Sequence, residues 1–461
     1  MPMAAHGQEH VENEGAGRLR RVLTAWDLIL YGIVAVTPIA PATVFGLAEL
    51  RSHGHAVVTI LAAMIAMVLT AVSYGRMAAL YPSAGSAYTY VGRSLHPYLG
   101  FAAGWTMLLD YFVNPLFCVL YGTLSLIRVL PGLPFMVGAA LFAGTITFFN
   151  LRGIRSTART NQIILGFMFT VLFCYVVLAV RYIYIRHGLC GLFSVRPFYT
   201  PSKFDLRDIA GATSFAALTY LGFDAVTTLA EDVQDPRKNV MRAAVGVCVF
   251  TGLFGGLLVY LGQLVWPDYT SYSNIETAFV DVTRRVGGIP LFWAMTSLLV
   301  VALLGAGMTA QVGAARLLFG MGRDNVIPSR FFAHLHHRRN TPNRNIWLVG
   351  LLAFFGAQIL SYETAAEILN FGAFLGFMGV NLAVIGEFWV RRRGGQDRSF
   401  VADLALPFLG FLFCTAIWLG LASPAKIAGS IWLVAGLGVL IAHTRGFRQS
   451  LSLPDPASYD S

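Results

Sequence analysis

Long apolar stretches separated by short polar segments recur along the whole chain. A helix needs roughly 20 apolar residues to cross the hydrocarbon core of a bilayer, and twelve stretches of about this length can be recognised. They lie at about 27–50, 57–80, 98–127, 134–150, 161–185, 208–230, 241–265, 289–320, 346–361, 364–390, 402–421 and 427–445. The pattern predicts an all-α polytopic membrane protein with twelve transmembrane helices in one membrane domain.

Composition and charge support this class and set an orientation. Of the 461 residues, 56% are apolar and 12% are charged, whereas about a quarter of a soluble chain is charged. With the N-terminus inside, 22 of the 33 Lys and Arg fall in inner segments, 10 in outer segments, and Arg316 within a span. Because basic residues favour the cytoplasmic side, we expect both termini to lie in the cytoplasm. We expect the protein itself to lie in the plasma or inner membrane of the cell. This asymmetry explains the net charge of +10 without nucleic-acid binding.

The first apolar stretch is interrupted near its middle by proline. Residues 32–41 read GIVAVTPIAP, and Thr37 and Pro38 lie about 15 Å from the start of the stretch at 1.5 Å per residue. That depth is the midplane of a core about 30 Å thick, where non-helical backbone is tolerated only against protein or a cavity. A simple proline kink would explain this stretch equally well. The residues that we expect to line a site here are Val36, Thr37, Pro38 and Ala40.

The sixth stretch has a second interruption at a matching depth. Residues 218–236 read LTYLGFDAVTTLAEDVQDP, and the sequence from Tyr220 to Gly222 lies about 17–20 Å into the span. Gly222 is followed by Phe223 and by the acid Asp224. A charged side chain at this depth is costly and marks a candidate functional site. We therefore expect these four residues to line the same site as the first interruption.

The two interrupted stretches open two runs of five spans each. Corresponding breaks in the two halves of a membrane protein indicate the binding site of a secondary transporter. Since each half has an odd number of spans, the halves have opposite orientations, which predicts a five-plus-five inverted repeat with two added C-terminal helices. The predicted division is a cytoplasmic tail (1–24), two repeats (25–190 and 205–393), the added helices (400–446) and a second cytoplasmic tail (447–461). The N-terminal tail is polar, so no cleavable signal peptide is expected.

Four segments carry a resemblance to a known family. They read YPSAGSAYTYVGRSL (81–95), LGFDAVTTLAEDVQDPRKNV (221–240), GRDNVIPSRFFAHLHHRRNTP (322–342) and ILNFGAFLGFMGVNLAVIGEFW (368–389). Together they resemble the amino acid–polyamine–organocation (APC) superfamily of permeases, and the last two resemble its putrescine-importer branch. The similarity extends over about residues 22–393. It implies the LeuT-like inverted-repeat fold with discontinuous helices 1 and 6, alternating access, and an amine or amino-acid substrate.

The first interruption departs from the family's amino-acid carriers. Many of these have a Gly-Ser-Gly type of break whose N–H groups bind the substrate carboxylate, whereas this chain has VTPIAP. Pro38 and Pro41 have no N–H to donate, and the C-terminal carbonyls of the half-helices favour a cation. Asp110 lies about 18 Å into the third span, and the rings of Trp105 and Tyr111 could face an ammonium group.

Structural roles are the alternatives for these polar residues. Asp110 could bond to a neighbouring helix, and Asp224 could hold the break together, because the superfamily often has GFD there whatever the substrate. Arg316 lies within a span, which implies a buried partner. The remaining candidates are Glu231 and Asp232, which form either an inner gate with Arg316 or a solvated helix end, and Gln311 and Asn370, on spans that line the path in such carriers.

Other chemistry is not indicated by the sequence. The histidines in AHLHHRR belong to a basic loop, and the five cysteines have no metal-ligand spacing. We therefore expect no metal, no cofactor and no enzymatic activity. The fifth span has no lysine that could replace a coupling ion, so by resemblance a proton carried by Asp110 or Asp224 is expected, with sodium and exchange left open. The prediction is a proton-coupled importer of a small organic amine such as putrescine; the alternatives are an amino-acid permease and, more remotely, a channel or transport-inactive sensor.

Overall fold

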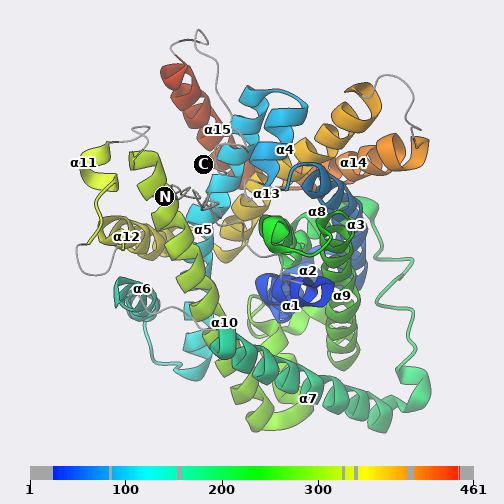
Figure 1. The fold of residues 1–461 in the computed structure, drawn as a ribbon. Helices are drawn as coiled ribbons and strands as arrows, with labels where there is room; N and C mark the ends of the chain where they lie inside the picture. The colour runs from blue at the N-terminus through cyan, green and yellow to red at the C-terminus, as the bar shows by residue number, and fades with distance from the viewer. Residues whose placement is uncertain are drawn as a thin grey trace, which may run out of the picture.

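The computed structural model describes residues 24–82, 86–152, 158–323, 328–336, 341–391, 399–444 and 446. All regular elements in these ranges are helices, which confirms the all-α class (Figure 1). Of the two predicted tails, only Thr24 lies within the described residues.

The helices follow the predicted spans in order. Their bounds are α1 Ala25–Val36, α2 Ala40–Arg51, α3 Ala56–Leu80, α5 Pro97–Val129, α6 Phe135–Arg152, α7 Ala158–Gly191, α8 Leu206–Ala216, α9 Pro236–Val265, α10 Ala278–Arg323, α12 Asn343–Ile359, α13 Tyr362–Val384, α14 Leu406–Leu419 and α15 Ser423–His443. Shorter elements lie between or extend them: α4 Ser86–Ser94, α11 Ser329–Phe332, the 3₁₀-helices η1 Ala217–Tyr220, η2 Phe223–Asp232 and η3 Tyr269–Ser271, and the π-helices η4 Ile385–Arg391 and η5 Phe400–Ala405.

The number of membrane crossings follows from helix length and apolar character. In the described ranges, 9 helices are long and apolar enough to cross, and two bent pairs raise this number to 11. The pairs are α1 with α2, bent by 49°, and α8–η1 with η2, bent by 41°. Helix α12 has 17 residues, the lower end of the range for a spanning helix. Helix α12 covers the ninth predicted span. If it crosses the membrane it would be the twelfth crossing, so the count of twelve stays a prediction.

One long helix contains a segment that the apolar pattern did not reveal. Gly288 interrupts α10 with φ 66° and ψ −159°, and the predicted eighth span begins directly after it. The preceding turns contain Asp281, Arg284 and Arg285. These charges remove the apolar signal, so the apolar pattern does not predict that this connection is helical.

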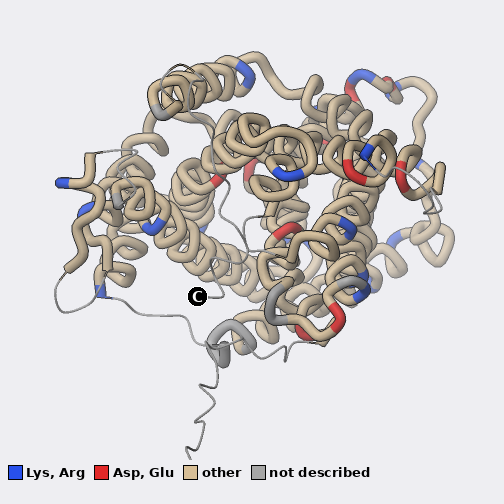
Figure 2. Tube along the Cα trace, turned by 45° about the horizontal axis from the view of Figure 1, so that its top comes forward, with Lys and Arg blue, Asp and Glu red and all other residues tan. Residues whose placement is uncertain are grey.

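Small residues bring the helices of the assembly close together. Gly75 of α3 faces Met241 of α9, and Gly252 of α9 faces Met64 of α3. Close approach at glycine is how membrane helices gain packing contacts when lipid is as apolar as the side chains. The broken span α1–α2 lies in the middle of the assembly, in contact with α8, α9 and η2 (Figure 1). Most Lys and Arg lie at its edges (Figure 2).

The orientation predicted from loop charge can be tested with two introduced thiols. Ser329 and Ser202 are both exposed in connections between spans. Because the basic residues favour a cytoplasmic N-terminus, we expect Ser329→Cys to react with a membrane-impermeant reagent only from the cytoplasmic side. Ser202→Cys should react only from outside. Labelling from the opposite sides at both positions would overturn the orientation.

Candidate functional site

The two helix breaks meet in the middle of the fold, as the sequence predicts. The first lies between α1 and α2, where Thr37 adopts a positive φ of 64°. The second lies between η1 and η2, where Gly222 has φ 102°. A Cβ atom added to Gly222 would lie 3.0 Å from the carbonyl oxygen of Ala35 at the end of α1. Glycine is therefore required there both by the backbone conformation and by the close approach of the two chains.

The first break offers hydrogen-bond acceptors rather than donors. The Thr37 N–H donates to the Ile33 carbonyl at 3.0 Å, and the Ala40 N–H donates to the Thr37 carbonyl at 2.8 Å. Pro38 supplies no N–H. Within the described residues, the carbonyls of Ala35 and Val36 accept no hydrogen bond from backbone or side chain. Two acceptors at a helix C-terminus thus remain beside Gly222, where a cation is favoured over an anion.

Two carboxyl groups lie at the level of the breaks. Asp224 is in the first turn of η2, close to the backbone N–H of Gly222. Asp110 of α5 is within electrostatic range of Asp224, and its Oδ1 is buried without a hydrogen-bond partner among the described residues. Tyr111 is within electrostatic range of both acids. Its side chain is 45% exposed and lies against Gly313 of α10. The fold therefore brings together three predicted site residues from two distant segments.

The second half of the sixth span has an unusual backbone. Helix η2 is a 3₁₀-helix of 10 residues, whereas runs longer than three or four residues are uncommon. Its first residue, Phe223, is buried with its ring centroid 5.5 Å from that of Tyr74 and 5.2 Å from that of Phe377. Tyr220 is buried too, and its hydroxyl donates to the Ile60 carbonyl of α3 at 2.8 Å. These two predicted binding residues pack against neighbouring helices and hold the break in place.

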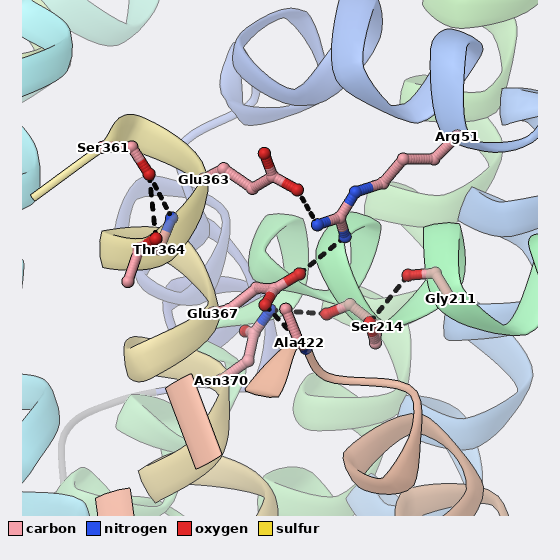
Figure 3. A network of polar contacts seen from close by, with 9 residues as sticks. All are labelled: Arg51, Gly211, Ser214, Ser361, Glu363, Thr364, Glu367, Asn370 and Ala422. Carbon is pink, nitrogen blue, oxygen red and sulfur yellow. Dashed lines mark hydrogen bonds and ion pairs between the residues drawn. The ribbon is translucent and has the colours of Figure 1, made fainter. Parts of the chain in front are cut away.

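Other predicted residues are engaged elsewhere in the fold. Gln311 of α10 donates to the Thr147 hydroxyl at 2.9 Å and accepts from Asn150 at 2.7 Å, which joins α10 to α6. Asn370 of α13 donates to the Ser214 carbonyl of α8 at 2.7 Å (Figure 3). Both side chains bridge helices, so a part in lining the path remains a prediction for them.

Trp105 stacks on Trp432 of α15, with ring centroids 4.9 Å apart. Each indole N–H of this pair donates to the other residue's carbonyl at 2.8 Å. The Trp105 ring, which was predicted to face an ammonium group, therefore forms the contact between α5 and α15 instead. Tyr111 is left as the aromatic neighbour of the two acids.

The expected inner gate stays a prediction. Arg316 is exposed, and none of the ion pairs among the described residues includes it. A long basic side chain can extend from a helix toward water, so this position does not by itself require a buried partner. The side chains of Glu231 and Asp232 lie outside the described residues, so their pairing with Arg316 stays untested.

An ion-pair network that the sequence reasoning missed joins the far ends of α2 and α13 (Figure 3). Arg51, the last residue of α2, pairs with Glu363 and with Glu367, the latter at 2.6 Å. Glu367 also accepts from the Ala422 N–H at 2.8 Å. The only hint in the sequence is the spacing of the two acids, four residues apart, which places them on one helix face.

Aromatic side chains fill the space next to this network. Tyr362 of α13 lies 4.8 Å from Tyr121 and 5.5 Å from Phe117 of α5, and 5.7 Å from Phe215 of α8, between ring centroids. The Tyr362 hydroxyl donates to the Thr43 carbonyl of α2 at 2.6 Å. All four rings are buried. The layer thus joins α2, α8 and the start of α13 to α5 by continuous packing.

Comparisons with known proteins agree with this architecture. Residues 26–442 match the family described as amino acid permease. The low-affinity putrescine importer PlaP of Escherichia coli K12 is 31% identical over 441 residues, which cover 95% of this chain and 96% of PlaP. The methylthioribose transporter of Bacillus subtilis is 27% identical, covering 93% of this chain and 94% of that protein.

The branched-chain amino acid permease BcaP of Bacillus subtilis is 24% identical and covers 94% of both chains. These relatives are named as an importer, a transporter and a permease, and each similarity spans nearly the whole chain. The family match likewise runs from the start of α1 almost to the end of α15. The chain is therefore an integral membrane protein that belongs to the amino acid permease family.

Proposed function

We propose that this protein imports a small organic amine of the putrescine type by alternating access across the cell membrane, with both termini in the cytoplasm. The observation that carries the proposal is the acceptor-rich centre of the fold. It contains Asp110 and Asp224 together with the free carbonyls of Ala35 and Val36. The full-length similarity to a protein named as a putrescine importer supports the same substrate class.

The charges of the site fit a diamine better than an amino acid. Ionised carboxylates and carbonyl oxygens can only accept hydrogen bonds, whereas an ammonium group can only donate them. One ammonium group would lie between Asp224 and the end of α1, and the other beside Asp110 with the Tyr111 ring. Of the backbone N–H groups from Thr37 to Ala40, those of Thr37 and Ala40 are used within the break. Few donors remain for a substrate carboxylate.

Alternating access requires that the outer layer open and close. We take the packed state of Arg51, Tyr362 and Glu367 as the form closed to the outside. Opening would separate α2 from α13, which breaks the ion pairs and exposes the aromatic layer. The 3₁₀-helix η2 would supply the movement on the inner side, because such segments often mark a hinge.

Coupling to a proton completes the proposal. Asp110 and Asp224 lie within electrostatic range of each other, and none of the ion pairs among the described residues includes either of them. Two like charges at short range disfavour double ionisation, so one carboxyl would carry a proton when no amine is bound. An amino-acid permease is the second candidate, favoured by the similarity to BcaP. It would bind a carboxylate through the remaining N–H of Ile39.

Substrate charge separates these two candidates. Putrescine and ornithine have the same carbon chain, but ornithine adds an α-carboxylate that the acceptor-rich site would leave unmatched. An unpaired buried polar group costs about 1–3 kcal/mol, which is about tenfold or more in affinity. We expect putrescine to inhibit labelled-amine uptake in proteoliposomes at correspondingly lower concentration than ornithine. If ornithine or a neutral amino acid competes better, the amine proposal is wrong and the permease reading replaces it.

The buried acid on α5 should matter most for doubly charged substrates. Asp110→Asn keeps the shape of the side chain and removes its charge, so we expect putrescine uptake to fall at least tenfold in apparent affinity. A loss of charge-assisted hydrogen bonding of about 1.5–3 kcal/mol underlies this estimate. The matched control is Asp268→Asn, because Asp268 is exposed in a connection and its pKa is lowered by hydrogen bonds from Thr270. Equal effects of the two variants would remove Asp110 from the site.

The two acids that pair with Arg51 should differ in their effect on outer closure. The side chain of Glu367 is 0% exposed and that of Glu363 is 41% exposed. Breaking a buried pair costs about 3–5 kcal/mol, and an exposed pair contributes about 0–1 kcal/mol.

The readout is labelling from outside of a thiol introduced at Ala366, which is buried one turn from Tyr362. We expect Glu367→Gln to raise its labelling rate more than tenfold and Glu363→Gln to change it only slightly. Similar rates in both variants would contradict a gating role for the buried pair.

A further inference from the structure

Glu49 is a buried acid that the proposed transport site does not use. It lies on α2, two residues before Arg51, and is 0% exposed. Neither Oε1 nor Oε2 has a hydrogen-bond partner among the described residues. Glu367, also 0% exposed in its side chain, has both Arg51 and the Ala422 N–H as partners. Glu49 and Glu367 are therefore in opposite situations.

The surroundings of Glu49 contain polar groups but no counter-ion. Tyr272, in the connection before α10, is within electrostatic range of Glu49, and the Tyr175 hydroxyl of α7 is occupied by the Leu258 carbonyl at 3.2 Å. Gln263 of α9 donates to the carbonyl of Gly54, while the Gly54 N–H donates to the Glu49 carbonyl at 2.8 Å. The Oε1 atom of Gln263 is itself a buried acceptor without a donor. The Gln263 Oε1 atom therefore needs a hydrogen-bond donor, and the O–H of a protonated carboxyl is a donor of that kind.

The charged groups at the same end of the fold are engaged with other partners. Arg51 pairs with Glu363 and Glu367. His53 lies 3.2 Å from Asp208. Other groups are His55, whose ring contacts the Ser52 carbonyl and the Thr200 N–H, Lys203, which lies over the Tyr269 ring, and Asp268, which accepts from Thr270. On α10, Asp281 pairs with Arg128 of α5, and Arg284 and Arg285 lie over the rings of Phe292 and Trp266. None of the described cations pairs with Glu49.

A carboxylate without a counter-ion is strongly disfavoured away from water and takes up a proton instead. We propose that Glu49 is a proton-binding site that takes one proton from the outer aqueous phase as the outer side closes. In the open form, water reaches the carboxylate. On closure, a proton from the outer solution forms an O–H bond on Glu49, and reopening returns it to that solution. This inference rests on the proposed alternating access, because it assigns the packed layer to a closed form.

The direction of the pH effect follows from linkage. The closed form binds one more proton than the open form, so closure is favoured at low outer pH and weakened as the pH rises. A one-proton difference changes the equilibrium by at most about tenfold per pH unit. The nearby competing acid is Glu276, which precedes α10 in the same connection as Tyr272. Its partial burial raises its pKa, so it must be tested separately.

The experiment uses the full chain in proteoliposomes at constant inner pH. The reporter is the Ala366→Cys thiol, labelled from outside and quantified against Cys190, which is exposed at the end of α7. The ratio corrects for the reactivity of thiols with pH. With Glu49 present, we expect the ratio to rise between pH 5 and pH 8, by up to about tenfold per unit over part of that range. In Glu49→Gln, which stays neutral, the ratio should remain low and constant.

Two further variants make every outcome informative. Glu49→Met is a second neutral replacement if Glu49→Gln does not reach the membrane, and Glu276→Gln should keep the pH response. A response that persists in the neutral Glu49 variants, or that is lost in Glu276→Gln, overturns the proposal. So does a ratio that is independent of pH with Glu49 present. Since labelling needs no substrate, a failure to transport putrescine would change the proposed function and leave this test intact.

Discussion

The structure depends on the requirement that backbone polar groups in the middle of a membrane be satisfied within the protein. A continuous helix meets the requirement by itself, whereas the breaks at Thr37 and Gly222 leave carbonyls exposed. The fold solves this by placing both breaks against each other at its centre, where Gly222 touches the last turn of α1. The same arrangement leaves two carbonyl acceptors at Ala35 and Val36. The carbonyls that the broken helix leaves without partners are therefore the same groups that give the site its acceptors.

Proline determines that the first break presents hydrogen-bond acceptors rather than donors. A break made by glycine and serine would present N–H groups as well as carbonyls, but Pro38 and Pro41 remove donors and start the next half-helix. Pro41 lies in the first turn of α2, as expected for a residue that cannot donate. With Asp110 and Asp224 nearby, α1, α5 and η2 all present hydrogen-bond acceptors to the centre. This accounts for the proposed preference for an amine without reference to the names of relatives.

The end of the molecule at which α2 meets α13 combines two kinds of buried acid. Glu367 is balanced by Arg51, so its burial with charge is compatible with a packed layer. Glu49 has no such partner among the described residues, and under the proposal above this would tie the closed arrangement of α2 to a neutral carboxyl. Aromatic contacts around Tyr362 fill the remaining space and connect α2, α5, α8 and α13. Closure at this end would thus combine an ion pair, apolar packing and protonation in one small region.

The sequence by itself determined most of the membrane-spanning helices and the place of the two breaks, but not the charged turns at the start of α10. Apolar length defines a spanning helix locally, and Pro38 and Gly222 act on their own backbone, so both signals are visible without neighbours. The sequence also identified Asp110 and Asp224 as candidates, because an acid in the middle of a span is rare whichever residues surround it.

Only the tertiary structure decided which polar side chains pair with one another. Arg51 finds Glu367 across most of the chain, Trp105 is taken by Trp432, and Arg316 turns out to be exposed. The 3₁₀ form of η2 and the isolation of Glu49 are of the same kind. Each depends on which helix faces are brought together, and packing between segments distant in sequence sets those contacts.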